Sequence, residues 1–146
     1  MILDSYGDFL SKDRRYAVFG VSRLKKKFGN YILESLQRSG YQAVGINPSA
    51  SGQPNIYSSI DASPLAPNAT IIAVARKNTQ MALKECQKFG INDIWLQPGT
   101  TRKNELDSID RPEGNFWAGR CILLYLESAR FPHNIHRGLL SIMGRH

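Results

Sequence analysis

Apolar residues recur along this 146-residue chain in short runs that alternate with segments of helical spacing. The runs are rich in β-branched and aromatic residues, which favour strands. Four of them predict buried strands, at Tyr16–Val21, Tyr41–Ile46, Thr70–Ala75 and Asp93–Gln97. We expect a short extended piece at Ile56–Ile60 and a fifth strand within Asn115–Leu126.

Apolar positions three and four residues apart predict helices between these strands. The helix Phe28–Ser39 carries Ile32 and Leu36 on one face, and Gly40 follows it as a left-handed cap. A second helix is predicted at Asn78–Phe89, with Asn78 or Thr79 as its cap. Two later helices are expected, at Arg102–Ile109 and Asn134–Met143.

Strands that alternate with helices are typical of an open parallel α/β sheet. We therefore predict a single domain over residues 1–146, an open parallel sheet of about five strands with helices on both faces. Ligands of such sheets bind beyond the carboxyl ends of the strands, where the strand order reverses. The predicted strands end there in Gly20-Val21-Ser22, Asn47-Pro48, Ala75-Arg76 and Gln97-Pro98.

The composition is that of a globular domain, with 42% hydrophobic residues. No apolar stretch approaches the roughly 20 residues that a membrane-spanning helix needs. The amino terminus lacks the basic start and apolar core of a secretory signal. Cys86 and Cys121 show neither metal spacing nor a disulfide framework, so we expect a cytoplasmic protein.

Positive charge gathers around the first strand and the loop after it. The net charge is +7, and residues 11–38 alone hold eight basic and two acidic side chains. Arg23 and Lys25–Lys27 directly precede the helix that begins at Phe28. A helix amino terminus favours anions. The pattern therefore predicts a site for a phosphorylated nucleotide cofactor.

Two positions narrow the choice of nucleotide. The dinucleotide fingerprint is missing, because Ser22 stands two residues after Gly20 and the next glycine is Gly29. Asn47 ends the second strand, where NAD-binding proteins usually place Asp or Glu to accept the ribose 2′-hydroxyl. An uncharged residue near basic side chains suits a phosphorylated ribose. NADP and coenzyme A (CoA) both remain open, whereas the P-loop of ATPases and GTPases is absent.

A series of motifs carries a family resemblance over Tyr16–Glu127. In order they are Gly20-Val21-Ser22, Gly40-Tyr41, Val44-Gly-Ile-Asn47-Pro48, Gly52, Tyr57-Ser-Ser-Ile60, Gly90-Ile-Asn-Asp-Ile-Trp-Leu-Gln97 and Arg120-Cys121. Together they resemble the small bacterial and archaeal CoA-binding proteins, which are similar to the amino-terminal CoA-binding domain of the succinyl-CoA synthetase alpha subunit. The resemblance implies a Rossmann-like fold with CoA across the carboxyl ends of the strands.

The resemblance also implies roles for individual residues. The phosphates are expected at Gly20, Val21, Ser22, Phe28 and Gly29, the adenosine at Asn47 and Pro48, and the pantetheine arm along Ala75, Arg76, Gln97 and Pro98. A 3′-phosphate and a pyrophosphate carry about four negative charges, which suits the basic side chains of Arg23, Lys25, Lys26 and Lys27.

The chain departs from the family pattern at two places. Ser49 stands where a lysine often follows Asn-Pro, so we expect one phosphate contact to be missing. The segment after Cys121 is longer and more apolar than the family leads one to expect. It would suit a cover over the pocket or the face of a homodimer.

Candidate catalytic chemistry is weak in this sequence, and we assign neither a catalytic residue nor a metal site. Cys121 lies in apolar surroundings without a histidine nearby in sequence, and His133 and His136 lack further ligands. The phosphorylated histidine of succinyl-CoA synthetase belongs to a separate carboxy-terminal domain, outside the resemblance. We therefore expect a stand-alone binding or sensor protein for CoA or an acyl-CoA rather than an enzyme.

Two other functions are weighed against CoA binding. A small NADP-dependent oxidoreductase is the alternative, with Tyr125 as the available proton donor. Nucleic-acid binding is disfavoured, because it calls for a basic stripe interleaved with exposed aromatic residues. Here the positive charge is concentrated around one loop.

Overall fold

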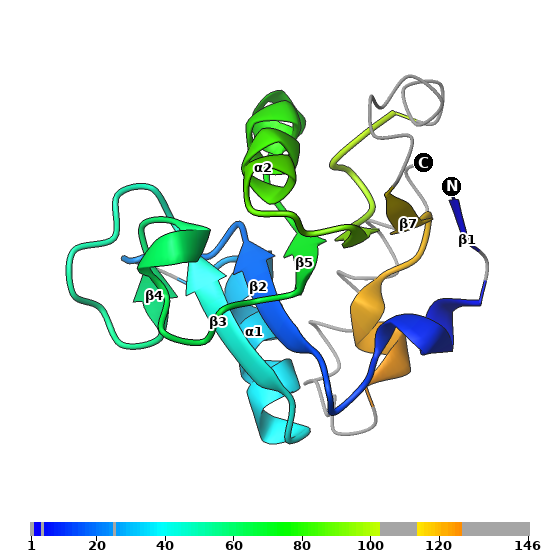
Figure 1. The fold of residues 1–146 in the computed structure, drawn as a ribbon, viewed down its shortest axis with the longest axis horizontal. Coiled ribbons are helices and arrows are strands. Elements are labelled where there is room, and N and C mark those ends of the chain that lie inside the picture. Colours follow the sequence, from blue (N-terminus) through cyan, green and yellow to red (C-terminus); the bar gives the residue numbers. More distant parts are fainter. Residues whose placement is uncertain (1, 4, 25, 103–113, 127–146) are drawn as a thin grey trace.

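The structure is a computed structural model that describes residues 2–3, 5–24, 26–102 and 114–126 (Figure 1). Its strands are β1 (Ile2–Leu3), β2 (Arg15–Phe19), β3 (Gln42–Ile46), β4 (Ile56–Tyr57), β5 (Ala69–Ile72), β6 (Asp93–Leu96) and β7 (Asn115–Ala118). Its helices are α1 (Phe28–Arg38), α2 (Arg76–Lys88) and the short 3₁₀ helices η1 (Tyr6–Phe9), η2 (Ile60–Ala62) and η4 (Ile122–Tyr125).

The strands form one parallel sheet in the order β1-β7-β6-β5-β2-β3-β4. This confirms the predicted Rossmann-like α/β fold, but the sheet has seven strands rather than about five. The two additional strands are edge strands of two residues each. The extended piece expected at Ile56–Ile60 supplies β4, whereas β1 was not predicted, because two apolar residues are too few to show a period.

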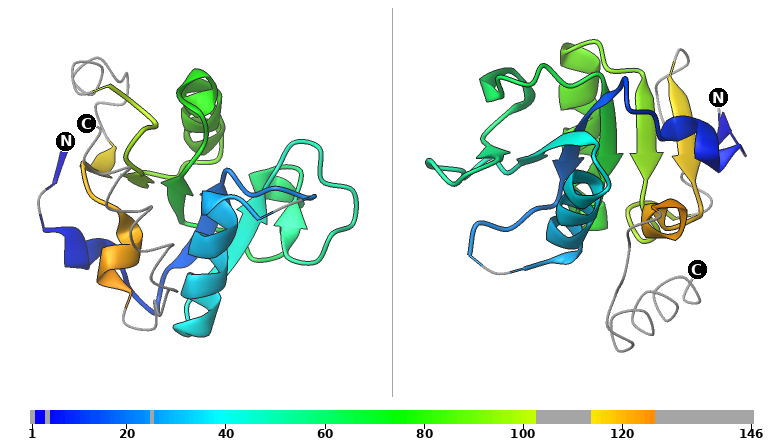
Figure 2. Two further views of the ribbon diagram at one scale, coloured as in Figure 1. Left: turned by 180° about the vertical axis from the view of Figure 1, so that it is seen from behind. Right: turned by 90° about the horizontal axis from the view of Figure 1, so that it is seen from below.

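Helices cover both faces of the sheet, as predicted (Figure 2). Tyr16 and Val18 of β2 face α1, η1 and η4, while Ala17 and Phe19 face α2. Side chains alternate between the two faces of a strand, so each face of this short strand contributes to its own core. All four residues are buried, as expected for a parallel strand that is covered on both sides.

Glycines end α1 and α2, at Gly40 as predicted and at Gly90 directly after the predicted second helix. Gly40 and Gly90 have φ angles of +86° and +71°. The N–H of the residue after each glycine then donates back into the last turn, from Tyr41 to the Leu36 carbonyl and from Ile91 to the Cys86 carbonyl, both at 2.9 Å. This is the Schellman arrangement, which a residue in the left-handed region makes possible.

The start of α2 differs from the prediction. The helix begins at Arg76 and is capped by Ala75, whose backbone carbonyl accepts a hydrogen bond from the N–H of Asn78 at 2.8 Å. Thr79 does not cap the helix, because its hydroxyl donates to the carbonyl of Thr100 at 2.6 Å. Ala75 and Arg76 thus lie at the amino terminus of α2 rather than at the end of a strand.

Several predictions concern residues outside the described part of the chain. The helices expected at Arg102–Ile109 and Asn134–Met143, and most of the segment after Cys121, belong to this group. Within the described ranges, no helix has the length and apolar character needed to cross a membrane.

Candidate functional site

The strand order reverses between β2 and β5, near the middle of the sheet. The chain leaves β2 through α1 to β3 on one side, and β5 lies on the other side of β2. In an open α/β sheet the ligand crevice forms beyond the carboxyl ends of the strands at such a reversal. We therefore expect the ligand crevice of this chain between the β2–α1 loop (residues 20–27, of which residue 25 lies outside the described part) and the connection from β5 to α2.

Gly20 brings the chain after β2 against the chain after β5. Its φ angle is +104°, and a Cβ there would lie 2.3 Å from the carbonyl oxygen of Ala73. The N–H of Ala73 donates to the carbonyl of Phe19 at 3.0 Å. Only glycine fits this position, since any side chain would meet both an unfavourable φ and a backbone atom.

Gly29 brings the first turn of α1 against the same loop. A Cβ on Gly29 would lie 2.6 Å from the carbonyl carbon and oxygen of Gly20. Gly45 of β3 packs equally closely, because its Cβ would lie 2.7 Å from a methyl carbon of Val21. Because they lack a Cβ, these glycines allow the start of α1 and the neighbouring strand β3 to pack directly against the loop. Glycine has the same packing role in dinucleotide-binding folds.

Asn30 holds the two ends of the β2–α1 loop. Its Oδ1 accepts hydrogen bonds from the backbone N–H of Ser22 at 2.8 Å and of Lys27 at 3.0 Å. Its Nδ2 donates to the carbonyl of Ser22 at 3.1 Å. The sequence analysis did not identify Asn30, although a polar residue at the third position of a helix is a signal of such backbone capping.

Asn47 supports the loop from the side of β3. Its Nδ2 donates to the carbonyl of Val21 at 2.9 Å, and its Oδ1 accepts from the N–H of Ser49 at 2.8 Å. The structure therefore brings the predicted adenosine residue Asn47 next to the predicted phosphate residues Val21 and Ser22. Pro48 follows Asn47 and is exposed.

The basic side chains of the loop differ in their partners. The ammonium group of Lys26 pairs with the carboxylate of Glu34 at 3.0 Å and lies 5.5 Å from the centre of the Tyr31 ring. The guanidinium groups of Arg23 and Arg76 make no hydrogen bond or ion pair with any described residue. Lys27 is exposed directly before α1, and Lys25 lies outside the described residues. Among the described residues, Lys26 is thus the one of these side chains with an acidic partner.

Gln97, predicted to line the pantetheine path, has a buried side chain that hydrogen-bonds three other residues. It is only 3% exposed. Its Oε1 accepts from the indole Nε1 of Trp95 at 3.0 Å and from the N–H of Ile122 at 2.8 Å, and its Nε2 donates to the Cys121 sulfur at 3.3 Å. The side chain ties β6 to η4, and the half-buried Pro98 follows it at the strand end.

Cys121 and Tyr125 have environments that bear on catalysis. Burial raises the pKa of the Cys121 thiol, although the hydrogen bonds from Gln97 and from the backbone of Leu123 and Leu124 oppose this. The ring of Tyr125 stacks on Tyr6, with 5.6 Å between their centres. A raised pKa keeps the Cys121 thiol protonated to higher pH, and a protonated thiol is a poor nucleophile. Among the described residues, no group of His, Cys, Asp or Glu has the arrangement of a metal site.

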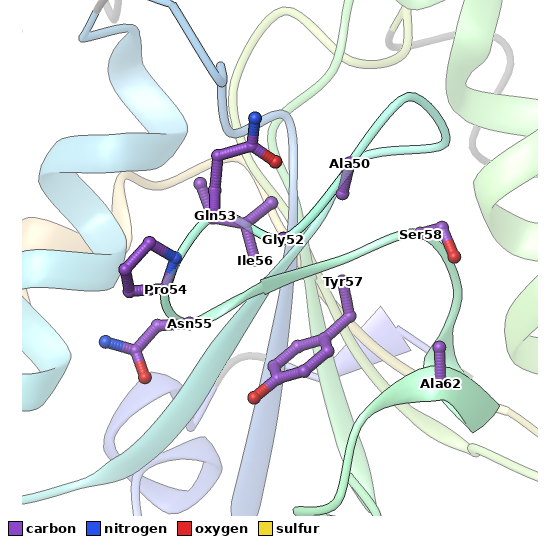
Figure 3. A pocket seen from close by; sticks show the side chains of 9 residues that line it. All are labelled: Ala50, Gly52, Gln53, Pro54, Asn55, Ile56, Tyr57, Ser58 and Ala62. Carbon is purple, nitrogen blue, oxygen red and sulfur yellow. The ribbon is translucent and has the colours of Figure 1, made fainter.

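A pocket of about 400 Å³ lies beside the edge strand β4. Gln53 and Pro54 lie on one side of it, and Ser58 and Ala62 on the other (Figure 3). The sequence analysis placed a short extended piece at Ile56–Ile60 but predicted no pocket here. This pocket is separated from the strand reversal by β3.

Comparison with known families assigns the chain to one of them. Residues 14–127 match a family described as the CoA binding domain. This chain belongs to the CoA-binding domain family. The match covers the whole β2–α1 loop, the ends of β3, β5 and β6, and Cys121, so it confirms the resemblance found in the sequence.

Solved structures agree with this assignment at the level of the fold. A conserved hypothetical protein from Pyrococcus furiosus is 26% identical with a TM-score of 0.65, over 76% of this chain and 97% of its own. A hypothetical protein from Pyrococcus horikoshii is 21% identical with a TM-score of 0.64, over 87% and 84%. A Thermus thermophilus protein is 17% identical with a TM-score of 0.69, over 84% and 94%. No curated protein matches the chain.

The predicted site residues of this CoA-binding domain fall into two sets. One set borders the strand reversal and comprises Gly20, Val21, Ser22, Arg23, Lys26, Lys27, Phe28, Gly29, Asn47, Pro48, Ala75 and Arg76. The other set is Gln97 and Pro98 at the end of β6, one strand further along the sheet. Contacts within the first set join Gly29 to Gly20 and Asn47 to Val21, whereas the amide of Gln97 is turned into the protein interior.

Proposed function

We propose that this chain binds coenzyme A or an acyl-CoA across the carboxyl ends of β2, β3 and β5, as a stand-alone binding or sensor protein. One observation carries the proposal. In a chain that belongs to the CoA-binding domain family, three close glycine contacts bring a basic loop and the start of α1 to the point where the strand order reverses.

The electrostatics of this edge support a ligand with several phosphates. Both α1 and α2 begin beside the reversal, so the positive ends of two helix dipoles face the same crevice. Arg23 and Arg76 add charges that no described acidic side chain neutralises. CoA carries about four negative charges on its phosphates, which matches this concentration of positive charge better than an uncharged metabolite does.

The surroundings of Cys121 and Tyr125 favour binding over catalysis. Cys121 is buried with a raised pKa, and Tyr125 packs against Tyr6 in the core on the α1 side. These two side chains were the available nucleophile and proton donor in the sequence. Their settings give the NADP-dependent oxidoreductase no support.

A ligand panel tests the proposal. The purified protein is titrated calorimetrically, and its thermal midpoint is measured, with CoA, dephospho-CoA, NADP and NAD. A ligand that binds only the folded state stabilises it by about 2.7 kcal/mol at a hundredfold excess over its dissociation constant. We expect binding of CoA and weaker binding of dephospho-CoA. Binding of NADP alone would instead establish a nucleotide site of the reductase type, and binding of none of the four would refute the proposal.

A further inference from the structure

We propose that Asn30 is the positioning residue of the CoA site: its carboxamide fixes the shape of the β2–α1 loop before the ligand arrives. The inference rests on the proposed function, because it assigns a role in that same site. It does not place Asn30 in contact with CoA.

The first argument is the geometry of the carboxamide. Oδ1 receives the N–H groups of Ser22 and Lys27, and Nδ2 returns a hydrogen bond to the carbonyl of Ser22, with all three distances between 2.8 and 3.1 Å. Ser22 is therefore held through both its N–H and its carbonyl group. One side chain closes the loop at both ends, and it does so from the first turn of α1, whose own position Gly29 fixes.

The second argument is that a residue at the end of β3 also binds the loop backbone next to Ser22. Asn47 of the β3 end donates to the carbonyl of Val21, the residue before Ser22. The peptide groups of Val21 and Ser22 are thus bound by two carboxamides, one from α1 and one from the end of β3. A change of the loop backbone would break several hydrogen bonds at once, so a single loop conformation is favoured.

The third argument concerns what remains available to a phosphate. The N–H of Ser22 is already bound by Asn30, so this amide is not a donor that the folded loop directs at an anion. The loop offers instead the side chain of Arg23 and the N–H groups of Phe28 and Gly29 at the start of α1, since the N–H groups of Asn30 and Tyr31 already donate to the carbonyl of Lys27 at 3.0 and 3.3 Å. Their direction is set by the loop conformation, and hence by Asn30. Preorganisation of this kind raises affinity by removing the cost of ordering the loop on binding.

The test compares Asn30→Ala with Asn68→Ala. Asn68 is a matched control, because its Oδ1 also accepts a backbone N–H, that of Arg15 at 2.8 Å, but at the opposite end of β2. We expect Asn30→Ala to weaken CoA binding at least tenfold in calorimetric titration while the variant remains folded. Asn68→Ala is expected to leave the affinity within twofold of the wild type, whatever it does to the thermal midpoint.

A measurement without ligand examines the loop itself. Amide hydrogen exchange at Ser22 and Lys27, whose N–H groups donate to Asn30, is expected to be at least tenfold faster in Asn30→Ala than in the wild type, and unchanged in Asn68→Ala. If the wild type binds CoA but Asn30→Ala binds with equal or higher affinity, the positioning role is wrong and the proposed function stands. If the wild type does not bind CoA, the proposed function fails and the positioning role falls with it, whatever the exchange rates are.

Discussion

Gly29 lies so close to Gly20 that a Cβ on Gly29 would be 2.6 Å from both the carbonyl carbon and the carbonyl oxygen of Gly20. The two glycines are nine positions apart, and the basic loop lies between them. Dinucleotide-binding folds make a similar approach with a shorter glycine-rich turn. The longer spacing keeps the helix start against the strand end and leaves room for several charged side chains between the two.

Gly29→Ala is predicted to destabilise the protein although it adds a better helix former. In an unobstructed helix this change would stabilise by up to about 1 kcal/mol. Here the methyl group meets the backbone of Gly20, and overpacking of this kind costs about 1–3 kcal/mol. We expect the free energy of unfolding in urea to fall by that amount and CoA affinity to fall with it.

Gly7→Ala is the control for this substitution. Nothing lies within 4 Å of a Cβ at Gly7, so we expect a change of less than about 0.5 kcal/mol. Equal stability of Gly29→Ala and the wild type would mean that α1 can move away from β2 at no cost, which contradicts a fixed crevice.

The fold could be predicted because its long elements carry strong local signals, and the errors lie at their ends. Gly20 and Val21 continue an apolar run, so the pattern extends the first strand through them. In the structure β2 ends at Phe19, because the φ of +104° at Gly20 turns the chain out of the sheet. The predicted start of α2 was also wrong. Threonine is a common helix cap, but the hydroxyl of Thr79 donates a hydrogen bond to the carbonyl of Thr100 instead.

The sequence singles out the close-packed glycines and Asn47, but it does not show the contacts of Asn30 and Gln97. Gly20, Gly29 and Asn47 stand at positions that composition and strand order single out. The role of Asn30 depends on Ser22, eight residues away, being folded back onto the first turn of α1. Likewise, the side chain of Gln97 points inward because it hydrogen-bonds Trp95, Cys121 and Ile122. Cys121 and Ile122 are 24 and 25 residues away in the sequence. A local sequence pattern therefore does not predict these contacts.

Arg23 and Lys26 are predicted to contribute unequally to CoA binding. Lys26 is paired with Glu34, whereas Arg23 makes no ion pair within the described residues. A hydrogen bond to a charged group contributes about 1.5–3 kcal/mol, so Arg23→Ala should weaken CoA binding about tenfold or more. Lys26→Ala should weaken it less than about threefold, since the pair with Glu34 already offsets its charge.

Salt dependence and a third variant complete this comparison. The dependence of log affinity on log salt concentration should become shallower in Arg23→Ala than in Lys26→Ala, because fewer ions are displaced on binding. Glu34→Gln releases Lys26 and should tighten CoA binding. Equal losses in Arg23→Ala and Lys26→Ala would show that the ion pair opens on binding and that both side chains reach the phosphates.

Gln97→Ala is predicted to affect stability rather than ligand contacts. The substitution leaves the buried N–H of Ile122 without its acceptor and opens a cavity beside Trp95 and Cys121. Such losses cost about 2–4 kcal/mol. Urea unfolding followed by tryptophan fluorescence measures this, with the exposed Gln87→Ala of α2 as a control expected to change by less than about 0.5 kcal/mol. A stable Gln97→Ala variant with lost CoA binding would instead assign Gln97 to the ligand.

Stability is predicted to fall in alkaline solution because of Cys121. Burial raises the pKa of this thiol in the folded protein, so above about pH 8.5, the ordinary thiol pKa, the unfolded chain loses its proton first. The unfolded state then binds fewer protons than the folded state, and the free energy of unfolding decreases as pH rises. The contribution of the protonated Cys121 thiol to the free energy of unfolding is fully present below about pH 8.5. It is lost as pH rises through the pKa of this thiol in the folded state. Tyr16, whose pKa burial also raises, adds a similar loss at higher pH.

The Cys121→Ser variant measures how much of this alkaline loss of stability comes from the thiol. Serine keeps a small side chain that can accept the hydrogen bond from Gln97, but it does not titrate in this range. We expect the variant to lose less stability than the wild type between pH 8 and pH 10, as measured by urea midpoints at each pH, whatever its stability at pH 7. Parallel curves for the two proteins would mean that the thiol ionises equally easily in both states. The sulfur would then be open to water and to thiol reagents, contrary to its burial beneath η4.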